Sequence, residues 1–143
     1  MKSSKFLSFI ISVFVVSCTS VETVPVLIVG GGASGVSAGI QSSRMGVESM
    51  IIEETPWLGG MLTSAGVSCI DGNYRMRSGI FGEFADSLAA RYGGYPALQT
   101  GWVSNINFDP HIGQEVFTNM AETCSDLLTV HRNSSVVSIG VFS

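Results

Sequence analysis

The chain has 143 residues, of which 45% are hydrophobic and 13% are charged. This length gives room for one domain with a real core, and the composition is that of a globular rather than a disordered protein. Seven basic residues against eleven acidic ones give a formal net charge of −4. Because the sequence contains no basic patch, nucleic acid is not an expected partner.

Residues 1–17 differ in composition from the rest of the chain. Two lysines within MKSSK precede the apolar run Phe6–Val16, which is 11 residues long. A membrane-spanning helix needs about 18 apolar residues or more, whereas a run of this length after a basic start is typical of a signal peptide. We therefore expect residues 1–17 to be a signal peptide.

The leader ends in Val-Val-Ser-Cys, with the cysteine at Cys18. This sequence resembles the lipobox of bacterial lipoproteins, in which the cysteine becomes the lipid-bearing first residue. The resemblance implies lipidation of Cys18, a tether over residues 18–24, and attachment to a membrane of the bacterial cell envelope. The alternative is a free cysteine in an ordinary signal or anchor segment, although an AxA-like cleavage site is absent.

The most informative segment begins at Val26–Val29, a short apolar run that predicts a strand buried on both faces. The glycines that follow are spaced as GxGxxG, at Gly30, Gly32 and Gly35, and a helix is predicted to begin near Ala33. In a βαβ unit the first glycine permits a sharp turn, the second lets a pyrophosphate approach the backbone, and the third lets helix and strand pack closely. The free N–H groups of the helix start then face the phosphates.

A second strand is predicted at Ser49–Ile52, and it ends in the acid Glu53. Glu53 lies 23 residues after Gly30, close to the ~20-residue spacing of an acid that binds the ribose of a dinucleotide. A carboxylate at this place repels a 2′-phosphate and so disfavours NADP. The alternative of a merely flexible glycine-rich loop does not account for the order of strand, glycines, helix, strand and acid.

From Val24 onward the chain resembles the glutathione-reductase-like family of FAD-dependent oxidoreductases. The nearest branch is similar to the flavoprotein subunit of heterodisulfide reductase. The resemblance rests on VLIVGGGASG (Val26–Gly35), IIEE (Ile51–Glu54) and WLGGMLTSAGV (Trp57–Val67), with weaker matches at SGIFGEF (Ser78–Phe84) and FDPHIGQEVFTNMAE (Phe108–Glu122).

The resemblance implies an α/β, Rossmann-like FAD/NAD(P)-binding domain with a parallel sheet, over residues 25–143. It implies FAD rather than NAD as the cofactor, because a second glycine pair follows the acid. Glu54 is a competing ribose ligand one residue later. The implied cofactor-binding residues are Gly30, Gly32, Ser34, Gly35, Glu53, Gly59, Gly60 and Thr63.

The same family has a late segment that returns to the sheet beside the flavin, and nothing similar occurs before Ser143. We therefore expect a domain that is incomplete at its C-terminus and belongs to a longer parent protein. The expected function is an exported, membrane-tethered FAD-dependent oxidoreductase with an unknown small-molecule substrate and an unknown redox partner. The alternatives are an NAD-dependent dehydrogenase and a truncated, non-catalytic dinucleotide-binding lipoprotein.

The remaining segments predict a three-layer α/β domain. Helical spacing of apolar residues predicts a helix at Ser78–Arg91, and Asp109-Pro110 is typical of the start of a helix that ends near Thr123. Strands are predicted at Leu127–Val130 and Val136–Val141, and a loop at Tyr92–Asn107.

No catalytic residue is assigned from the sequence. Cys124 is expected to be a buried structural thiol; it could pair with Cys69 in an oxidising compartment, and a redox-active Cys69 near flavin is less expected because a close cysteine partner is missing. His111 and His131 lack metal-ligand spacing and are expected on the solvated surface, with a role as flavin-site acid or base as the alternative. A solvated face is also the preferred interpretation over an acidic-substrate site for Tyr74, Arg75 and Arg77.

Overall fold

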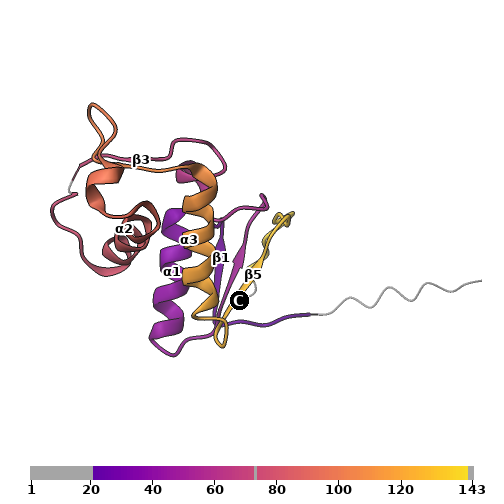
Figure 1. Cartoon of the computed structure of the whole chain (residues 1–143). Helices are drawn as coiled ribbons and strands as arrows, with labels where there is room; N and C mark the ends of the chain where they lie inside the picture. The colour runs from indigo at the N-terminus through magenta and orange to yellow at the C-terminus, as the bar shows by residue number, and fades with distance from the viewer. Residues whose placement is uncertain (1–20, 73, 142–143) are drawn as a thin grey trace, which may run out of the picture.

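The computed structural model describes residues 21–72 and 74–141 of the chain (Figure 1). The expected signal peptide and Cys18 lie outside these residues. The elements in chain order, with η for short 3₁₀ helices, are β1 (Val26–Val29), α1 (Ala33–Arg44), β2 (Ser49–Ile52), η1 (Gly60–Leu62), β3 (Cys69–Ile70), α2 (Gly79–Tyr92), η2 (Tyr95–Leu98), β4 (Ile106–Asn107), α3 (Pro110–Glu122) and β5 (Leu128–His131).

A parallel sheet with the strand order β1-β2-β5 forms the base of the fold. Val26 pairs with Ser49, and Ser49 pairs with Leu128 in the next strand. This is the 3-2-1 order of one mononucleotide-binding half of a Rossmann-like domain. A separate antiparallel pair, β3-β4, lies in the excursion between β2 and β5. The expected α/β class with a parallel sheet is therefore confirmed.

Helix α1 packs on the sheet, α3 lies beside α1, and α2 packs against α3 (Figure 1). The rings of Phe84 on α2 and Phe117 on α3 stack with centroids 4.2 Å apart, and Phe108 meets Phe84 edge-on at 5.6 Å. These aromatic contacts join the outer helix to the core beneath it. None of the helices in the described residues has the length and apolar character needed to span a membrane.

The sheet is covered by helices on one face, so two expectations were wrong. Ile28 of β1 packs into the core, whereas Leu27 and Val29 on the opposite face are 56% and 60% exposed. Successive strand residues point to opposite faces, and in the described residues α1 and α3 lie on the Ile28 side. The strand is therefore not buried on both faces, and the layers number two rather than three.

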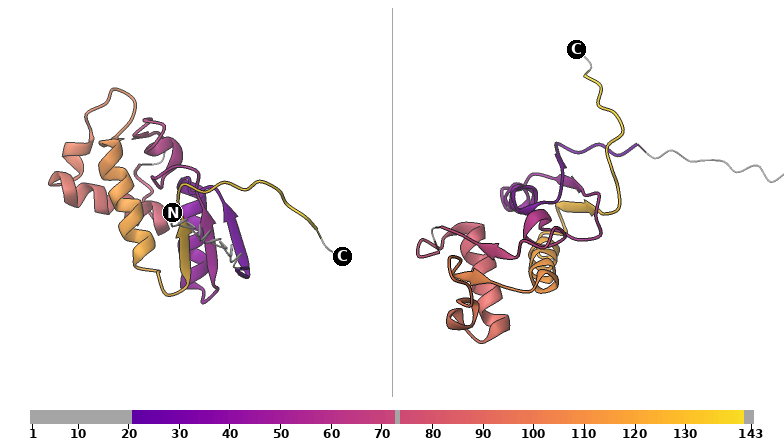
Figure 2. Two further views of the ribbon diagram at one scale, coloured as in Figure 1. Left: turned by 90° about the vertical axis from the view of Figure 1, so that its right-hand side faces the viewer. Right: turned by 90° about the horizontal axis from the view of Figure 1, so that it is seen from above.

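The predicted strand Val136–Val141 was also wrong. These residues are extended but pair with no described strand, and they run away from the body of the domain (Figure 2). Val137 and Val141 are 95% and 94% exposed. A β-branched sequence favours extended backbone, but a strand forms only when a neighbour satisfies its N–H and C=O groups.

The other elements follow the sequence closely. Helix α1 begins at the expected Ala33, and α2, α3 and β5 differ from their expected bounds by about one residue. The expected loop at 92–107 contains η2 and the short strand β4. Asp109 precedes α3 with extended backbone, and its carboxylate accepts a 2.7 Å hydrogen bond from the Tyr92 hydroxyl rather than capping the helix.

The contact between Gly35 and the first glycine is the tightest constraint on α1. A Cβ at position 35 would lie 1.9 Å from the carbonyl oxygen of Gly30, a backbone atom that cannot move aside alone. We predict that Gly35→Ala lowers the free energy of unfolding by about 3 kcal/mol or more. Urea unfolding followed by circular dichroism measures this, with Gln41→Ala on the exposed side of α1 as control. Equal stability of the two variants would contradict the prediction.

Candidate dinucleotide-binding site

The glycine loop joins β1 to α1 at the carboxyl end of the sheet. Gly30 has φ +98°, and its N–H donates a 2.8 Å hydrogen bond to the carbonyl of Ile52 at the end of β2. Gly32 is the N-cap of α1, with φ −63° and ψ 175°. The first N–H groups of α1 therefore point out of the loop with the positive end of the helix dipole, an arrangement suited to an anion.

The three glycines of the motif are required for different reasons. Gly30 needs the left-handed φ that side chains rarely adopt, and Gly35 needs the missing Cβ because Gly30 lies against it. Gly32 needs neither: its backbone is in an ordinary extended conformation, and no atom lies within 4 Å of the position a Cβ would take. Neither backbone strain nor a crowded neighbour requires glycine at 32, and the empty space beside it is open to a ligand.

Glu53 lies directly behind this loop and is only 7% exposed. One carboxylate oxygen, Oε2, accepts a 2.6 Å hydrogen bond from the N–H of Gly31. The other, Oε1, accepts bonds from Thr55, at 2.8 Å from its N–H and 2.6 Å from its hydroxyl. The acid at the end of β2 is thus fixed to the loop after β1.

These hydrogen bonds set the charge of Glu53. Burial of the carboxyl group raises its pKa. Hydrogen bonds from the hydroxyl and N–H of Thr55 and from the N–H of Gly31 lower the pKa by more than burial raises it, so the pKa of Glu53 lies below its ordinary value. Donors aimed at a carboxylate stabilise its ionised form. Glu53 is therefore an anionic acceptor at neutral pH.

The second glycine pair lies against the first loop. The N–H of Gly59 donates a 2.8 Å hydrogen bond to the carbonyl of Gly31, and Gly59 bridges to Gly32 in the parallel sense. A Cβ on Gly60 would lie 3.0 Å from the Cα of Gly32. The structure therefore brings together both glycine segments that the sequence singled out.

Other expected cofactor residues lie at different places. Ser34 is exposed in the first turn of α1. Thr63 is 1% exposed, and its hydroxyl donates a 2.7 Å hydrogen bond to the carbonyl of Leu58, so the side chain faces the protein. Glu54, the competing ribose ligand, is exposed and lines a cavity of about 160 Å³ together with Gly30 and Glu53.

Sequence reasoning missed three residues that bond to Glu53, of which Thr55 and Ser134 line this cavity. Gly31 and Thr55 bond the Glu53 carboxylate, and the N–H of Ser134, beyond β5, donates a 3.0 Å bond to the Glu53 carbonyl. A polar residue two positions after the acid was a visible signal for Thr55. Ser134 reaches the site through the fold of a distant segment, so no local pattern could have indicated it.

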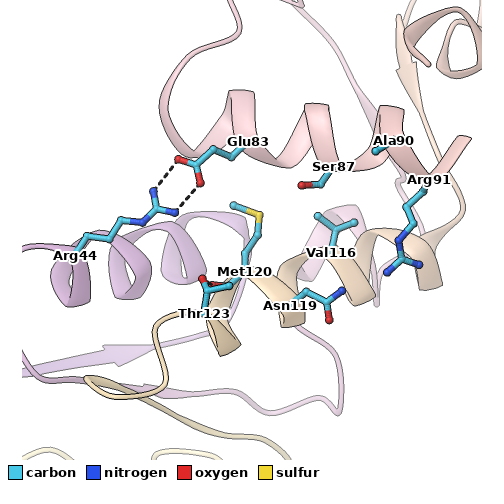
Figure 3. A pocket seen from close by; sticks show the side chains of 9 residues that line it. All are labelled: Arg44, Glu83, Ser87, Ala90, Arg91, Val116, Asn119, Met120 and Thr123. Atoms are coloured by element: carbon cyan, nitrogen blue, oxygen red, sulfur yellow. Dashed lines mark hydrogen bonds and ion pairs between the residues drawn. The ribbon is translucent and has the colours of Figure 1, made fainter. Parts of the chain in front are cut away.

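A larger cavity of about 530 Å³ lies between α2 and α3 (Figure 3). It is beside Arg44, in the last turn of α1, and therefore at the end of that helix opposite the glycine loop. Arg44 donates two hydrogen bonds to the Glu83 carboxylate, at 2.7 and 2.6 Å. No residue that lines this cavity also lines the one beside Glu53.

The cysteines and histidines do not converge on the site either. Cys124 is buried in the core as expected, Cys69 is half-buried on β3, and the two are free thiols. His131 is not simply solvated, because its Nε2 lies 3.3 Å from a carboxylate oxygen of Glu22. His111 is exposed. Within residues 21–72 and 74–141, no group of three potential ligands could hold a metal ion.

Of the turn residues expected on a solvated face, Arg75 and Arg77 are exposed as expected, whereas Tyr74 is half-buried. Arg77 lies over the ring of Tyr95 with 3.6 Å between the guanidinium carbon and the ring centroid, and Arg75 lies 5.5 Å from the ring centre of Tyr74. Tyr74 itself packs against the hydrophobic core. Cation–π contacts therefore account for the position of both arginines.

The bonds to Glu53 predict a measurable effect on stability. In Glu53→Gln an NH₂ group replaces one carboxylate oxygen, and it must face either the N–H of Gly31 or the donors of Thr55. Because a donor cannot bond to a donor, we expect the free energy of unfolding to fall by about 1–3 kcal/mol at neutral pH. Folding lowers the pKa of Glu53. The stabilisation that ionised Glu53 gives the wild type is therefore fully present above the pKa of the unfolded chain, and it is lost as the pH falls through the lower pKa of the folded protein. The variant should lack this pH dependence.

Urea unfolding at neutral and acidic pH tests both points. Glu54→Gln is the matched control, because Glu54 is the neighbouring acid and its side chain is exposed. If Glu53→Gln and Glu54→Gln unfold alike at every pH, the bonds to Glu53 do not stabilise the fold.

Three solved structures illustrate the likeness to known proteins. THI4 of Thermovibrio ammonificans is 19% identical over 76% of this chain and 38% of that one, with a TM-score of 0.44. CabE, an aromatic hydroxylase from angucycline biosynthesis, is 20% identical over 78% and 24%, with a TM-score of 0.47. PieE, a flavin-dependent monooxygenase solved with FAD and substrate, is 17% identical over 77% and 24%, with a TM-score of 0.39.

The chain thus spans between 24% and 38% of the length of these neighbours. A comparison with curated proteins finds no significant match. A family model described as FAD dependent oxidoreductase matches residues 25–141, which is most of the chain. The glycine loop, the acid behind it and the parallel sheet agree with that match, and the expected FAD cofactor is confirmed with it. The chain belongs to the FAD-dependent oxidoreductase family.

Proposed function

We propose that this chain supplies the site for the ADP half of FAD in an exported, membrane-tethered oxidoreductase of the glutathione-reductase-like branch. The observation that supports this most directly is Gly32. Its extended backbone and empty Cβ direction would accept many residues, yet the chain has glycine there. Close approach of a pyrophosphate to the backbone explains that choice.

The residues present fit the nucleotide end of FAD. The N–H groups at the start of α1, beyond Gly32, are the donors for the pyrophosphate. Glu53 is the acceptor for the adenosine ribose hydroxyls, and its negative charge disfavours a 2′-phosphate. Gly59 and Gly60 keep the chain close beside the loop without side chains in the way.

When bound, FAD supplies the redox chemistry, accepting and passing on electrons or a hydride. The described residues contribute binding and orientation of its nucleotide half. The substrate is proposed to be a small molecule, and the electron partner is left unassigned. We assign no catalytic residue, because among the described residues neither Cys69 nor Cys124 nor either histidine lines the cavity beside Glu53.

Two alternatives differ in what they bind. An NAD-dependent dehydrogenase would use the same loop and acid, but it has no need for a second glycine pair against Gly32. A non-catalytic dinucleotide-binding lipoprotein would retain the loop without redox turnover. Ligand titration distinguishes the first alternative, and a reducible bound flavin distinguishes the second.

The proposed role of Gly32 gives a sharp binding test. We predict that Gly32→Val weakens FAD binding by more than roughly tenfold, which is about 1.4 kcal/mol, because its side chain occupies the pyrophosphate position. The free energy of unfolding should fall by only about 1 kcal/mol, because the space beside Gly32 is empty and valine is merely a poorer N-cap than glycine. Fluorescence titration with FAD and with NAD measures the affinities, and thermal unfolding verifies the fold.

Ala38→Val, on the exposed side of α1, is the matched control. Firm NAD binding without FAD binding would favour the dehydrogenase. Failure of the wild type to bind either nucleotide would overturn the proposed site. Equal FAD affinity of wild type and Gly32→Val would remove the main argument for it.

The proposed location depends on Cys18 and the leader before it. We predict that Cys18→Ser abolishes labelling by a radioactive or alkyne-tagged fatty acid and blocks leader processing in a bacterial host, because the serine has no thiol for lipid attachment. Gel mobility and membrane fractionation accompany the labelling experiment. Full labelling of Cys18→Ser would contradict the lipoprotein assignment, whereas it would leave the FAD site untouched.

A further inference from the structure

We propose that Thr55 is a positioning residue for nucleotide binding, which fixes the Glu53 carboxylate and leaves Oε2 as the oxygen for the ribose. This inference rests on the proposed function, because it assigns Glu53 to the ribose. It adds a residue that has no place in the GxGxxG motif and that acts only through the acid.

The first argument counts the acceptor positions of Glu53. An ionised carboxylate offers about four lone-pair sites. Three of these are used inside the protein: two on Oε1 by the N–H and hydroxyl of Thr55, and one on Oε2 by the N–H of Gly31. One position, on Oε2, is left for a ribose hydroxyl while all three bonds are made.

The second argument is that the Thr55 hydroxyl has two possible acceptors. Its Oγ1 lies 2.6 Å from Oε1 of Glu53 and 2.8 Å from the carbonyl oxygen of Trp57. A hydroxyl has a single hydrogen, so it can bond one of them fully at a time. With that hydrogen turned to Trp57, Oε1 keeps a single donor, the N–H of Thr55, while Oγ1 still occupies the space beside it. The Thr55 hydroxyl therefore determines how firmly Oε1 is held and leaves Oε2 as the oxygen for the ribose.

The third argument concerns the charge around Glu53. Among the described residues no lysine, arginine or histidine forms an ion pair with it. Glu54 follows it and lines the same cavity, and His131 lies beside it on β5 but pairs with Glu22. The lowered pKa of Glu53 therefore comes from the bonds of Thr55 and Gly31 acting against burial.

Substitutions at Thr55 separate these effects. Thr55→Ser keeps the hydroxyl and both of its acceptors. Thr55→Val keeps the size and the backbone N–H but places a methyl group against Oε1. Thr129→Val, at an exposed residue of β5, is the matched control for the exchange of threonine for valine.

The first measurement is a titration of the Glu53 carboxyl carbon by ¹³C NMR in the nucleotide-free protein. We expect a pKa below the ordinary glutamate value in the wild type, Thr55→Ser and Thr129→Val, and a higher one in Thr55→Val. An unchanged pKa in Thr55→Val overturns the inference. A wild-type pKa at or above the ordinary value also overturns it, and that result needs no folded variant.

The second measurement is the affinity for ADP, the nucleotide half of FAD, as a function of pH. At neutral pH we expect Thr55→Val to bind about two- to tenfold more weakly, because the Glu53 side chain is no longer held and must be ordered when the ribose binds, and Thr55→Ser to bind as the wild type does. Acid protonates Glu53, so Thr55→Val should lose affinity at a higher pH than the wild type. A purely structural role of Thr55 would leave this pH profile in place.

The outcomes keep the two proposals apart. If the wild type does not bind ADP, the proposed function fails and the NMR titration alone decides the role of Thr55. If the wild type binds ADP and Thr55→Val matches it in affinity and pH profile, the positioning role is wrong and the nucleotide site stands. Should Thr55→Val fail to fold, Thr55→Ala compared with Thr55→Ser gives the same contrast.

Discussion

A buried carboxylate holds the nucleotide loop of this protein in place. Glu53 closes β2, and its bond to the N–H of Gly31 joins that strand to the turn after β1. Removing a carboxylate from water is costly unless donors replace the lost hydration. Gly31 and Thr55 supply three donors. The glycine loop is therefore fixed by a buried carboxylate, and its position depends on Glu53 remaining ionised.

The glycine loop is also supported by the segment between β2 and β5, which contains α2 and α3. Gly59 bonds to Gly31, and a Cβ on Gly59 would lie 2.7 Å from Phe117 of α3. Phe117 in turn stacks on Phe84 of α2. A chain of contacts thus runs from the outer helix to the glycine loop. The excursion between β2 and β5 supports the loop as well as filling the core.

The elements of the site that the sequence predicted correctly lie close together in the chain. The strand, the glycines, α1 and Glu53 lie within some thirty residues, and each has a preference that its neighbours reinforce. Gly35, in the first turn of α1, meets the carbonyl of Gly30 just beyond β1, which is the close approach of helix and strand that the motif predicts. The structure brings these residues together as the spacing indicated.

The predictions that were wrong concern residues whose surroundings depend on segments distant in the sequence. Val136–Val141 has strand composition but no described strand to pair with, and Leu27 has no helix above it. Thr63 follows the glycine pair like a ligand residue, yet its hydroxyl bonds to Leu58. Pattern alone does not specify the partner of a polar or β-branched side chain.

The order of the strands also bears on how the domain folds. β2 pairs with β1 across one helix, but its other partner, β5, is separated from it by more than half of the described residues. Closing a long loop costs entropy before its contacts reward it, so non-local pairings form slowly. The loop and its acid belong to the local pair. The glycine loop can therefore assemble early, while the third strand and the helices behind Gly59 are added late.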